Sequence, residues 1–291
     1  MGKVIIESAV NGLNKRARNP HIPYTTQEII DDSLAACDAG ASMIHYHVLS
    51  PEGEWSDDIG DYGAVIRGIR ASNRVGGKAV LWPTFAAGTN IPERFRHYTE
   101  LSKEPETKPD LGACDMGSLN LLRWDLKAKD FVRANVYENS VASCKEVLQL
   151  MKDAGLHRPT LQVFDPTHLR TILKFLELGL LAEPLVIKFY FGGPEQPFGM
   201  PPTPKCLEAY VEMLEGAKAV WFASCFGGDV LPLAPFAVAM GGHIRVGLED
   251  YHYEEEGQAT NTELVERAAA IVHALGHEVA TPQEARAMMG I

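Results

Sequence analysis

The stretch AVWFASCFGGDVLPLAPFAVAMGGHIRVGL, residues 219–248, contains the pattern that decides the fold class. Two short apolar runs, Ala219–Cys225 and His243–Leu248, lie on either side of a helical pattern at Leu233–Met240. A strand followed by a helix and then by another strand is typical of parallel β-sheet, because the helix carries the chain back to the edge where the first strand began. The stretch therefore predicts one unit of an α/β protein.

The same alternation extends through the rest of the chain. Further strands are expected at Val4–Ser8, Ser42–His47, Lys78–Trp82, Leu111–Asp115, Thr160–Phe164 and Leu185–Phe191. Further helices are expected at Gln27–Ala39, Asp61–Arg70, Pro92–Leu101, Ser143–Ala154, Thr167–Leu178, Lys205–Leu214 and Glu263–Leu275. Eight strand–helix units in 291 residues predict a (β/α)8 TIM barrel, a fold that commonly takes about 250 residues. We expect residues 1–291 to form one barrel domain with a C-terminal helical extension.

Local signals refine this expectation. The segment 118–135 is long for a simple connection, and Lys127–Asp130 inside it predicts the turn of a hairpin or excursion. Thr25 with Glu28, and Thr281 with Glu284, match the capping box, in which a hydroxyl residue is answered by a Glu three residues later. For the helix near Glu263, either Asn261 or Thr262 is expected to be the N-cap residue.

Composition excludes several function classes. The formal net charge is −11, which disfavours binding to nucleic acid or to an anionic membrane surface. The five cysteines are odd in number and include no CxxC pair, so we expect reduced thiols and no disulfide framework. No apolar run approaches the roughly 18 residues of a membrane span, and the first residues lack the layout of a signal peptide. We therefore expect a soluble, cytoplasmic protein.

Two short motifs indicate a metal site. His45 and His47 end the second expected strand, and side chains at i and i+2 of a strand point the same way. Glu249 follows the eighth strand, a neighbour of the first and close to the second in a closed barrel. Two imidazoles and one carboxylate form a typical catalytic zinc site, although cobalt, manganese and iron accept the same ligands. Arg245 is expected to pair with Asp250 or with a substrate carboxylate.

Each motif alone has a simpler interpretation. An HxH pair on an apolar strand can be two core histidines, and Arg245 with Glu249 and Asp250 can be a structural salt-bridge network. Their joint position at the ends of barrel strands, where barrel active sites lie, favours the metal site. Most other histidines are expected at the surface: His21, His97, His157, His252, His273 and His277. The glycine pairs at 192–193 and 227–228 are weak candidates for an anion-binding loop.

Several longer strings resemble one enzyme family. They are VNG at 10–12, HYH at 45–47 followed by PEG at 51–53, GGHIRVGLED at 241–250, and EVATPQEAR at 278–286. The chain resembles the β-keto acid cleavage enzymes, typified by 3-keto-5-aminohexanoate cleavage enzyme. The resemblance implies a zinc-dependent barrel, a homo-oligomer such as a dimer or tetramer, and a reaction of a β-keto acid with acetyl-CoA. The products would be acetoacetate and a shortened acyl-CoA.

Carried onto this sequence, the resemblance assigns roles to individual residues. It implies that His45, His47 and Glu249 are the metal ligands, and that Asp250 and Arg245 form the acid/base dyad. In such a reaction the metal polarises the ketone oxygen, and the departing carbanion is stabilised as an enolate. Asp250 would be the base.

Departures from the family pattern concern the substrates. Asn14 stands where the aminohexanoate enzyme has a Glu that pairs with an ammonium group, so we expect a substrate with a neutral or anionic tail. The residues that hold the substrate carboxylate in the family also differ, and Thr84 and Ser118 are the expected replacements. Leu49 and Gly228 replace arginines of the family pattern, and the change at Gly228 removes a coenzyme A contact.

The substrate tail and the reaction class both leave alternatives. An uncharged tail is preferred on the basis of Asn14, whereas Lys15 and Arg16 would favour a dicarboxylate if they turn inward. The competing enzyme class is a metal-dependent hydrolase or C–C lyase that acts on a small carboxylate without coenzyme A. A metal-binding protein on an inactive barrel is the non-enzymatic alternative. A requirement for acetyl-CoA separates the first class from the others.

Overall fold

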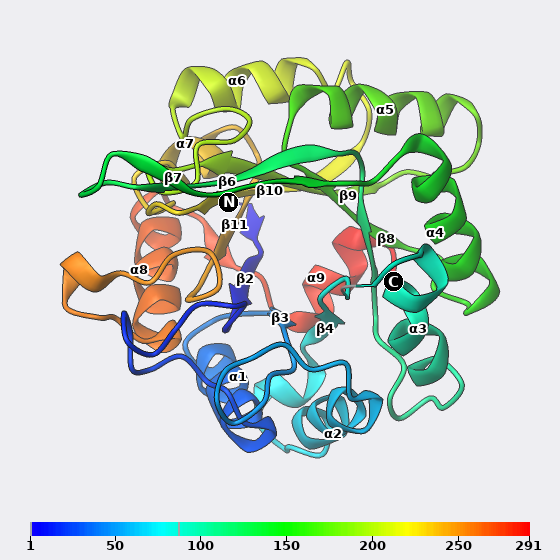
Figure 1. Cartoon of the computed structure of the whole chain (residues 1–291), viewed down its shortest axis with the longest axis horizontal. Coiled ribbons are helices and arrows are strands. Elements are labelled where there is room, and N and C mark those ends of the chain that lie inside the picture. The colour runs from blue at the N-terminus through cyan, green and yellow to red at the C-terminus, as the bar shows by residue number, and fades with distance from the viewer. Residues whose placement is uncertain (1, 87) are drawn as a thin grey trace.

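The structure, a computed structural model, describes residues 2–86 and 88–291. Eight strands form one parallel sheet in the order β4-β3-β2-β11-β10-β9-β8-β5 (Figure 1). They are β2 (Ile6–Ala9), β3 (Met43–Tyr46), β4 (Val80–Pro83), β5 (Gly112–Asp115), β8 (Pro159–Val163), β9 (Leu185–Gly192), β10 (Ala219–Phe226) and β11 (His243–Val246). This order confirms the predicted TIM barrel, because chain neighbours are also sheet neighbours from β5 round to β4.

The two ends of this sheet meet through a side chain. Asp110, just before β5, donates its backbone N–H to the carbonyl oxygen of Leu81 on β4 at 2.9 Å. Its Oδ2 accepts the N–H of Leu81 at 2.8 Å. Asp110 thus replaces the missing strand pairing and nearly closes the barrel.

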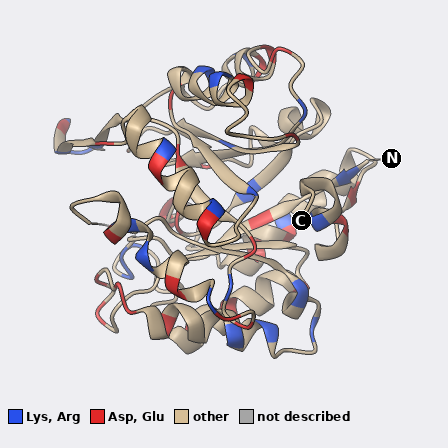
Figure 2. Ribbon diagram, turned by 90° about the vertical axis from the view of Figure 1, so that its right-hand side faces the viewer, with Lys and Arg blue, Asp and Glu red and all other residues tan. Residues whose placement is uncertain are grey.

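Helices cover the outside of the strands (Figure 1). They are α1 (Thr26–Asp38), α2 (Ile59–Arg70), α3 (Ile91–Leu101), α4 (Val141–Asp153), α5 (Pro166–Glu177), α6 (Pro204–Glu212), α7 (Ala234–Ala239), α8 (Asn261–Ala274) and α9 (Pro282–Met289). Both Lys/Arg and Asp/Glu segments occur along these outer helices (Figure 2). In the described part of the chain, no helix combines the length and the apolar character needed to cross a membrane.

Helix starts follow the expected chemistry, with one correction. Thr25 and Thr281 form the predicted capping boxes of α1 and α9. The N-cap of α8 is Thr260, which forms a third capping box with Glu263, so the expectation of Asn261 or Thr262 is wrong. Thr260 is the N-cap because it lies three residues before Glu263. At this spacing the Thr260 hydroxyl accepts the N–H of Glu263, and the Glu263 carboxylate accepts the N–H of Thr260. Asn261 is then free for the contact described below.

Two additions extend the barrel. At the end where the strands begin, β1 (Lys3–Val4) pairs with β12 (Glu278–Val279), and α9 follows directly. At the opposite end, β6 (Leu119–Asp125) and β7 (Asp130–Tyr137) form an antiparallel hairpin. This hairpin is the excursion that the turn at Lys127–Asp130 predicts.

Candidate active site

Three predicted ligands meet at the barrel mouth. One ligand atom each of His45, His47 and Glu249 lies within 4.8 Å of the other two. His45 Nε2 is 3.0 Å from Glu249 Oε2, and His47 Nε2 is 3.4 Å from Glu249 Oε1. Ligand atoms about 2.0–2.1 Å from a tetrahedral ion would be roughly 3.3 Å apart. The spacing therefore suits a small divalent cation.

Neighbouring strands fix the two histidines. His45 lies on β3 opposite Ala9 of β2, and its Nδ1 lies 3.1 Å from the carbonyl oxygen of Trp82 on β4. His47 follows the end of β3, where Asn11 binds its backbone twice. Asn11 Oδ1 accepts the N–H of His47 at 2.9 Å, and Asn11 Nδ2 donates to the carbonyl oxygen of His47 at 2.9 Å. Asn11 is a positioning residue that sequence reasoning did not assign.

A protonation argument explains why a cation fits. Burial lowers the pKa of His45 to about 4, so its ring carries one proton at neutral pH. A carbonyl oxygen only accepts hydrogen bonds, so the proton belongs on Nδ1 beside the carbonyl of Trp82. Nε2 therefore presents a lone pair to Glu249 Oε2, which accepts no hydrogen bond from the described residues. A cation relieves this contact between a lone pair and a carboxylate oxygen, so the residues fit a metal ion.

Glu249 lies on a tightly packed loop beyond the end of β11. Gly247 has a φ of +152° and approaches the backbone of Ala9 so closely that a Cβ there would lie 2.1 Å from the Ala9 oxygen. Gly12, with a φ of +56°, packs against the Glu249 side chain, and a Cβ there would lie 2.5 Å from Glu249 Cγ. Asn261 Oδ1 accepts the N–H of Leu248 at 2.9 Å. The loop therefore has little freedom to move its carboxylate.

Arg245 and Asp250, the two residues predicted to act as a dyad, are in direct contact. Arg245 donates from Nη2 to Asp250 Oδ1 at 2.8 Å and from Nε to Asp250 Oδ2 at 3.0 Å. Ser224 on β10 donates its hydroxyl to Asp250 Oδ2 at 2.5 Å. Burial raises the pKa of Asp250 to about 6, although Arg245 acts in the opposite direction. Arg245 Nη2 also lies 2.8 Å from Glu249 Oε1, so one guanidinium joins both carboxylates.

Beneath the dyad lies a charged pair that the sequence reasoning missed. Glu7 on β2 accepts from Arg245 Nη1 at 3.0 Å and contacts Lys188 on β9, and all three side chains are fully buried. Burial lowers the pKa of Lys188 to about 8, against the opposing charge of Glu7. A signal was available, because each of these two residues is a lone charge inside an otherwise apolar strand.

Charge balance gives a second argument for a cation. Glu7, Glu249 and Asp250 bring three negative charges, and Lys188 with Arg245 brings two positive ones. The buried cluster therefore has a net charge of −1 when His45 and His47 are neutral. Buried charges are stable only when paired, and a divalent ion would leave the cluster with one positive charge, which suits an anionic substrate.

The three predicted substrate-binding residues lie in different surroundings. Asn14 Nδ2 donates to the carbonyl oxygens of Leu248 and Glu249 at 2.6 and 2.8 Å, so its amide supports the loop that carries the carboxylate. Thr84 is buried at the end of β4, and its hydroxyl makes a long contact of 3.4 Å to the carbonyl oxygen of Phe85. Ser118 Oγ accepts the N–H of Asn139 at 2.8 Å.

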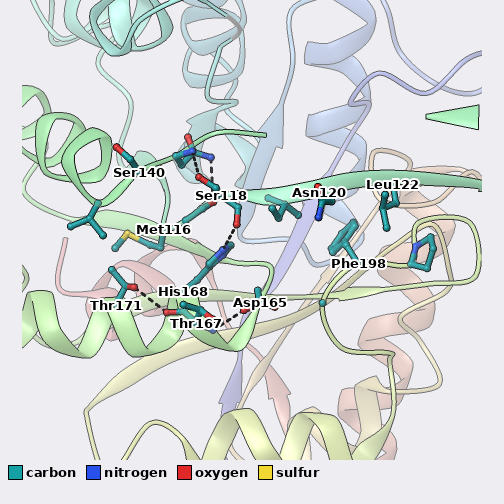
Figure 3. A pocket seen from close by; sticks show the side chains of 16 residues that line it. Met116, Ser118, Asn120, Leu122, Ser140, Asp165, Thr167, His168, Thr171 and Phe198 are labelled. Atoms are coloured by element: carbon teal, nitrogen blue, oxygen red, sulfur yellow. Dashed lines mark hydrogen bonds between the residues drawn. The ribbon is translucent and has the colours of Figure 1, made fainter. Parts of the chain in front are cut away.

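Ser118 lines a cavity of about 610 Å³ that none of the three predicted ligands lines. Figure 3 shows its walls, formed by the start of β6, the first turns of α4 and α5, and the loop after β9. Residues labelled there include Asn120, Leu122, His168 and Phe198. Ser118 thus lines a cavity whose lining does not include His45, His47 or Glu249.

Some secondary expectations need correction. His97 and His252 are buried rather than at the surface. His97 is held because its Nε2 lies 2.9 Å from the carbonyl oxygen of Thr84, and His252 because its Nε2 lies 3.3 Å from Glu195. In the glycine loops, the N–H of Gly193 donates to the carbonyl oxygen of Phe226, and that of Gly227 to Asp250. These two amides are therefore not available to an anion.

Comparisons with known proteins agree on one family. A family model described as beta-keto acid cleavage enzyme matches residues 3–291. The 3-keto-5-aminohexanoate cleavage enzyme of Acetoanaerobium sticklandii is 28% identical over 294 residues, covering 100% of this chain and 99% of the relative. The 3-dehydrocarnitine:acetyl-CoA trimethylamine transferase of Rhizobium meliloti is 29% identical over 307 residues, covering 98% and 95%.

A solved structure is similar in fold. The binary complex of ObcA with oxaloacetate superposes with a TM-score of 0.73 at 16% identity, covering 93% of this chain and 67% of that chain. At this level of identity the likeness supports the barrel fold alone.

Proposed function

The chain belongs to the beta-keto acid cleavage enzyme family, and we propose that it reacts a small β-keto acid with acetyl-CoA. The products are acetoacetate and a shortened acyl-CoA. A zinc ion, or another divalent ion that accepts the same ligands, is held by His45, His47 and Glu249. The family places the chain among C–C-cleaving enzymes, and the printed name of the Rhizobium meliloti relative supports acetyl-CoA as the second substrate.

The convergence of the three ligand atoms beside the Asp250–Arg245 pair carries this proposal. Each ligand side chain is at most a tenth exposed, so the cluster is almost fully buried. When bound, a divalent cation would polarise the ketone oxygen of the substrate. The protein supplies the rest through groups that are already oriented.

In this proposal Asp250 takes a proton from the reacting carbon. Arg245 holds both of its oxygens and Ser224 holds Oδ2, so the carboxylate cannot rotate away. Its raised pKa makes it a stronger base than a surface carboxylate. The carbanion left at C2 of the β-keto acid would attack the thioester carbonyl of acetyl-CoA and release the coenzyme A thiolate. The thiolate would then add to the original keto carbon, and the C2–C3 bond would break to give the shortened acyl-CoA and acetoacetate as its enolate, which takes back the proton.

The substrate tail is expected to be uncharged. Asn14 carries no charge and is used to support the loop at Glu249. Lys15 and Arg16, which would favour a dicarboxylate, are occupied. Lys15 Nζ binds Glu54 at 2.8 Å, and Arg16 Nη2 binds Glu28 at 2.7 Å. Because both cations that could bind a second carboxylate are already paired, a neutral tail is expected.

Measuring acetoacetate tests the proposal. Purified protein of known metal content is supplied with a panel of β-keto acids that carry neutral, anionic or cationic tails, with and without acetyl-CoA. Acetoacetate is expected only when acetyl-CoA is present, with neutral tails ranked first. His47→Ala is expected to lose both the metal and the activity while keeping the fold, as seen by circular dichroism.

Failure would be informative. If metal-loaded protein forms no acetoacetate from any member, the cleavage reaction is wrong, and a metal-dependent hydrolase or C–C lyase becomes the better hypothesis. If His47→Ala unfolds, the metal is structural. The homo-oligomer and the cytoplasmic location stay predictions.

A further inference from the structure

The β6–β7 hairpin extends over the mouth of the barrel. At its base, the hydroxyl of Tyr137 donates to Asp115 Oδ2 at the end of β5. Near its tip, the N–H of Trp124 donates to the carbonyl oxygen of Glu195, in the loop after β9, at 2.8 Å. The two anchors lie at β5 and just after β9, the two neighbours of β8 in the sheet. The hairpin therefore runs along the part of the barrel mouth formed by β5, β8 and β9 (Figure 1).

The two faces of the hairpin have different environments. Arg133, Asn135 and Tyr137 alternate along β7 and therefore share a face, and Arg133 Nε donates to Asn135 Oδ1 at 2.7 Å. This is the face that Tyr137 turns towards Asp115 and the barrel mouth. Asn120 and Leu122, on the other face, line the cavity of Figure 3, which at the hairpin base also reaches Leu119 opposite Tyr137.

A pair of arginines lies on the mouth-facing side. Arg123 is directly opposite Arg133 in the strand pairing, and both are exposed. Like charges directly opposite each other destabilise a strand pair. Neither forms an ion pair with any described residue, although the whole chain has a net charge of −11. Two unpaired guanidinium groups on one face form a site for an anion that accepts from both, and phosphate fits such planar forks well.

We propose that Arg123 and Arg133 bind the phosphate groups of coenzyme A. This inference rests on the proposed use of acetyl-CoA as a substrate. The phosphates of that molecule are separated from the thioester by a pantetheine arm, whose length resembles roughly four extended residues, or about 14 Å. Arg133 lies four residues from Tyr137 along β7, or about 13 Å at strand spacing. Arg133 is thus about one arm's length along the hairpin from Tyr137, which contacts Asp115 at the end of β5.

Kinetics with two thioesters test the assignment. The double variant Arg123→Gln/Arg133→Gln keeps side-chain length and removes both charges. We expect its KM for acetyl-CoA to rise about tenfold, with kcat changed less than about twofold, since two exposed charge contacts together contribute roughly this factor. Acetyl-pantetheine lacks the phosphates, so its kcat/KM is expected to be equal in the variant and the wild type. The KM of the β-keto acid is expected to stay constant.

A matched control removes the effect of overall charge. Lys145→Gln/Lys152→Gln deletes two exposed lysines of α4 and changes the net charge equally, and its KM for acetyl-CoA is expected to equal that of the wild type. Salt provides a second readout, because the wild-type KM for acetyl-CoA should rise with ionic strength more steeply than that of the arginine variant.

Specific results would overturn the inference. An unchanged KM for acetyl-CoA would remove the phosphate site from the hairpin, and a raised KM for the β-keto acid alone would assign the pair to a substrate carboxylate. Calorimetric titration with coenzyme A tests the arginine site separately from the proposed cleavage reaction. If the wild type binds coenzyme A more tightly than the variant yet forms no acetoacetate, the arginine site stands and the reaction is wrong.

Discussion

Replacing Glu7 with Gln tests whether the barrel interior depends on its buried charges. The carboxylate of Glu7 contacts both Lys188 and Arg245, and all three side chains have no exposed surface. A Gln side chain has nearly the same shape but offers one oxygen, so its NH2 group must face one of the two cations. Removing one partner of a buried ion pair typically lowers stability by about 3–5 kcal/mol. That loss is large against a total of about 5–15 kcal/mol.

Urea unfolding followed by circular dichroism measures this effect. The Glu7→Gln variant is expected to lose about 3–5 kcal/mol of the free energy of unfolding, with Lys188→Met as the second single variant. The double variant Glu7→Gln/Lys188→Met removes both charges and lets the Gln oxygen face Arg245. Its loss is expected to fall short of the sum of the single losses by about 2 kcal/mol, because the two residues are in contact.

Two results would refute the reasoning. A loss below about 1 kcal/mol for Glu7→Gln would mean that water or a shifted pKa neutralises the cluster at little cost. Additive losses in the cycle would mean that Glu7 and Lys188 do not interact energetically. The double variant keeps the test usable if Glu7→Gln does not fold, because recovery of a folded protein on adding Lys188→Met is then the expected result.

Three further predictions concern the candidate site. Asp250→Asn is expected to keep the metal and lower kcat by roughly 10²–10⁴-fold, and a near-normal kcat would exclude Asp250 as the base. Gly12→Ala is expected to displace Glu249 and to weaken metal affinity by roughly 10–100-fold, as measured by chelator competition. Unchanged affinity would show that the loop moves to make room for the new methyl group. Asn14→Ala removes two hydrogen bonds from the same loop and is expected to weaken metal binding about tenfold without reordering the preferred β-keto acids. A reordered preference with normal metal affinity would instead make Asn14 a substrate contact.

The sequence was sufficient for the fold because the relevant signals are local. Strand and helix positions depend on periodicity over a few residues, and the expected Leu185–Phe191 and the observed β9 (Leu185–Gly192) differ by one residue. The same locality places His45 and His47 on one face. Bringing Glu249 to them requires only that the first and last barrel strands be neighbours, which closure of a barrel dictates.

Contacts between residues far apart in the chain could not be predicted from the sequence patterns. Glu7 and Lys188 lie 181 residues apart, and their contact crosses the barrel interior instead of following the sheet. A lone charge in an apolar strand indicates that a partner exists, but not which one. The role of Asn14 was hidden for a similar reason, because its partners are backbone carbonyls that leave no signature in the sequence.

The buried charges link the stability of the barrel to the chemistry at its mouth. Arg245 could direct its charge either inwards to Glu7 or outwards to Asp250 and Glu249. Lys188 contacts Glu7 from below and offsets its charge, so the pull of Glu7 on Arg245 is reduced. The guanidinium can then hold Asp250 through two nitrogens while it approaches Glu249. Through Glu7, the buried strand residue Lys188 thus influences how strongly the arginine orients the proposed base and a proposed metal ligand.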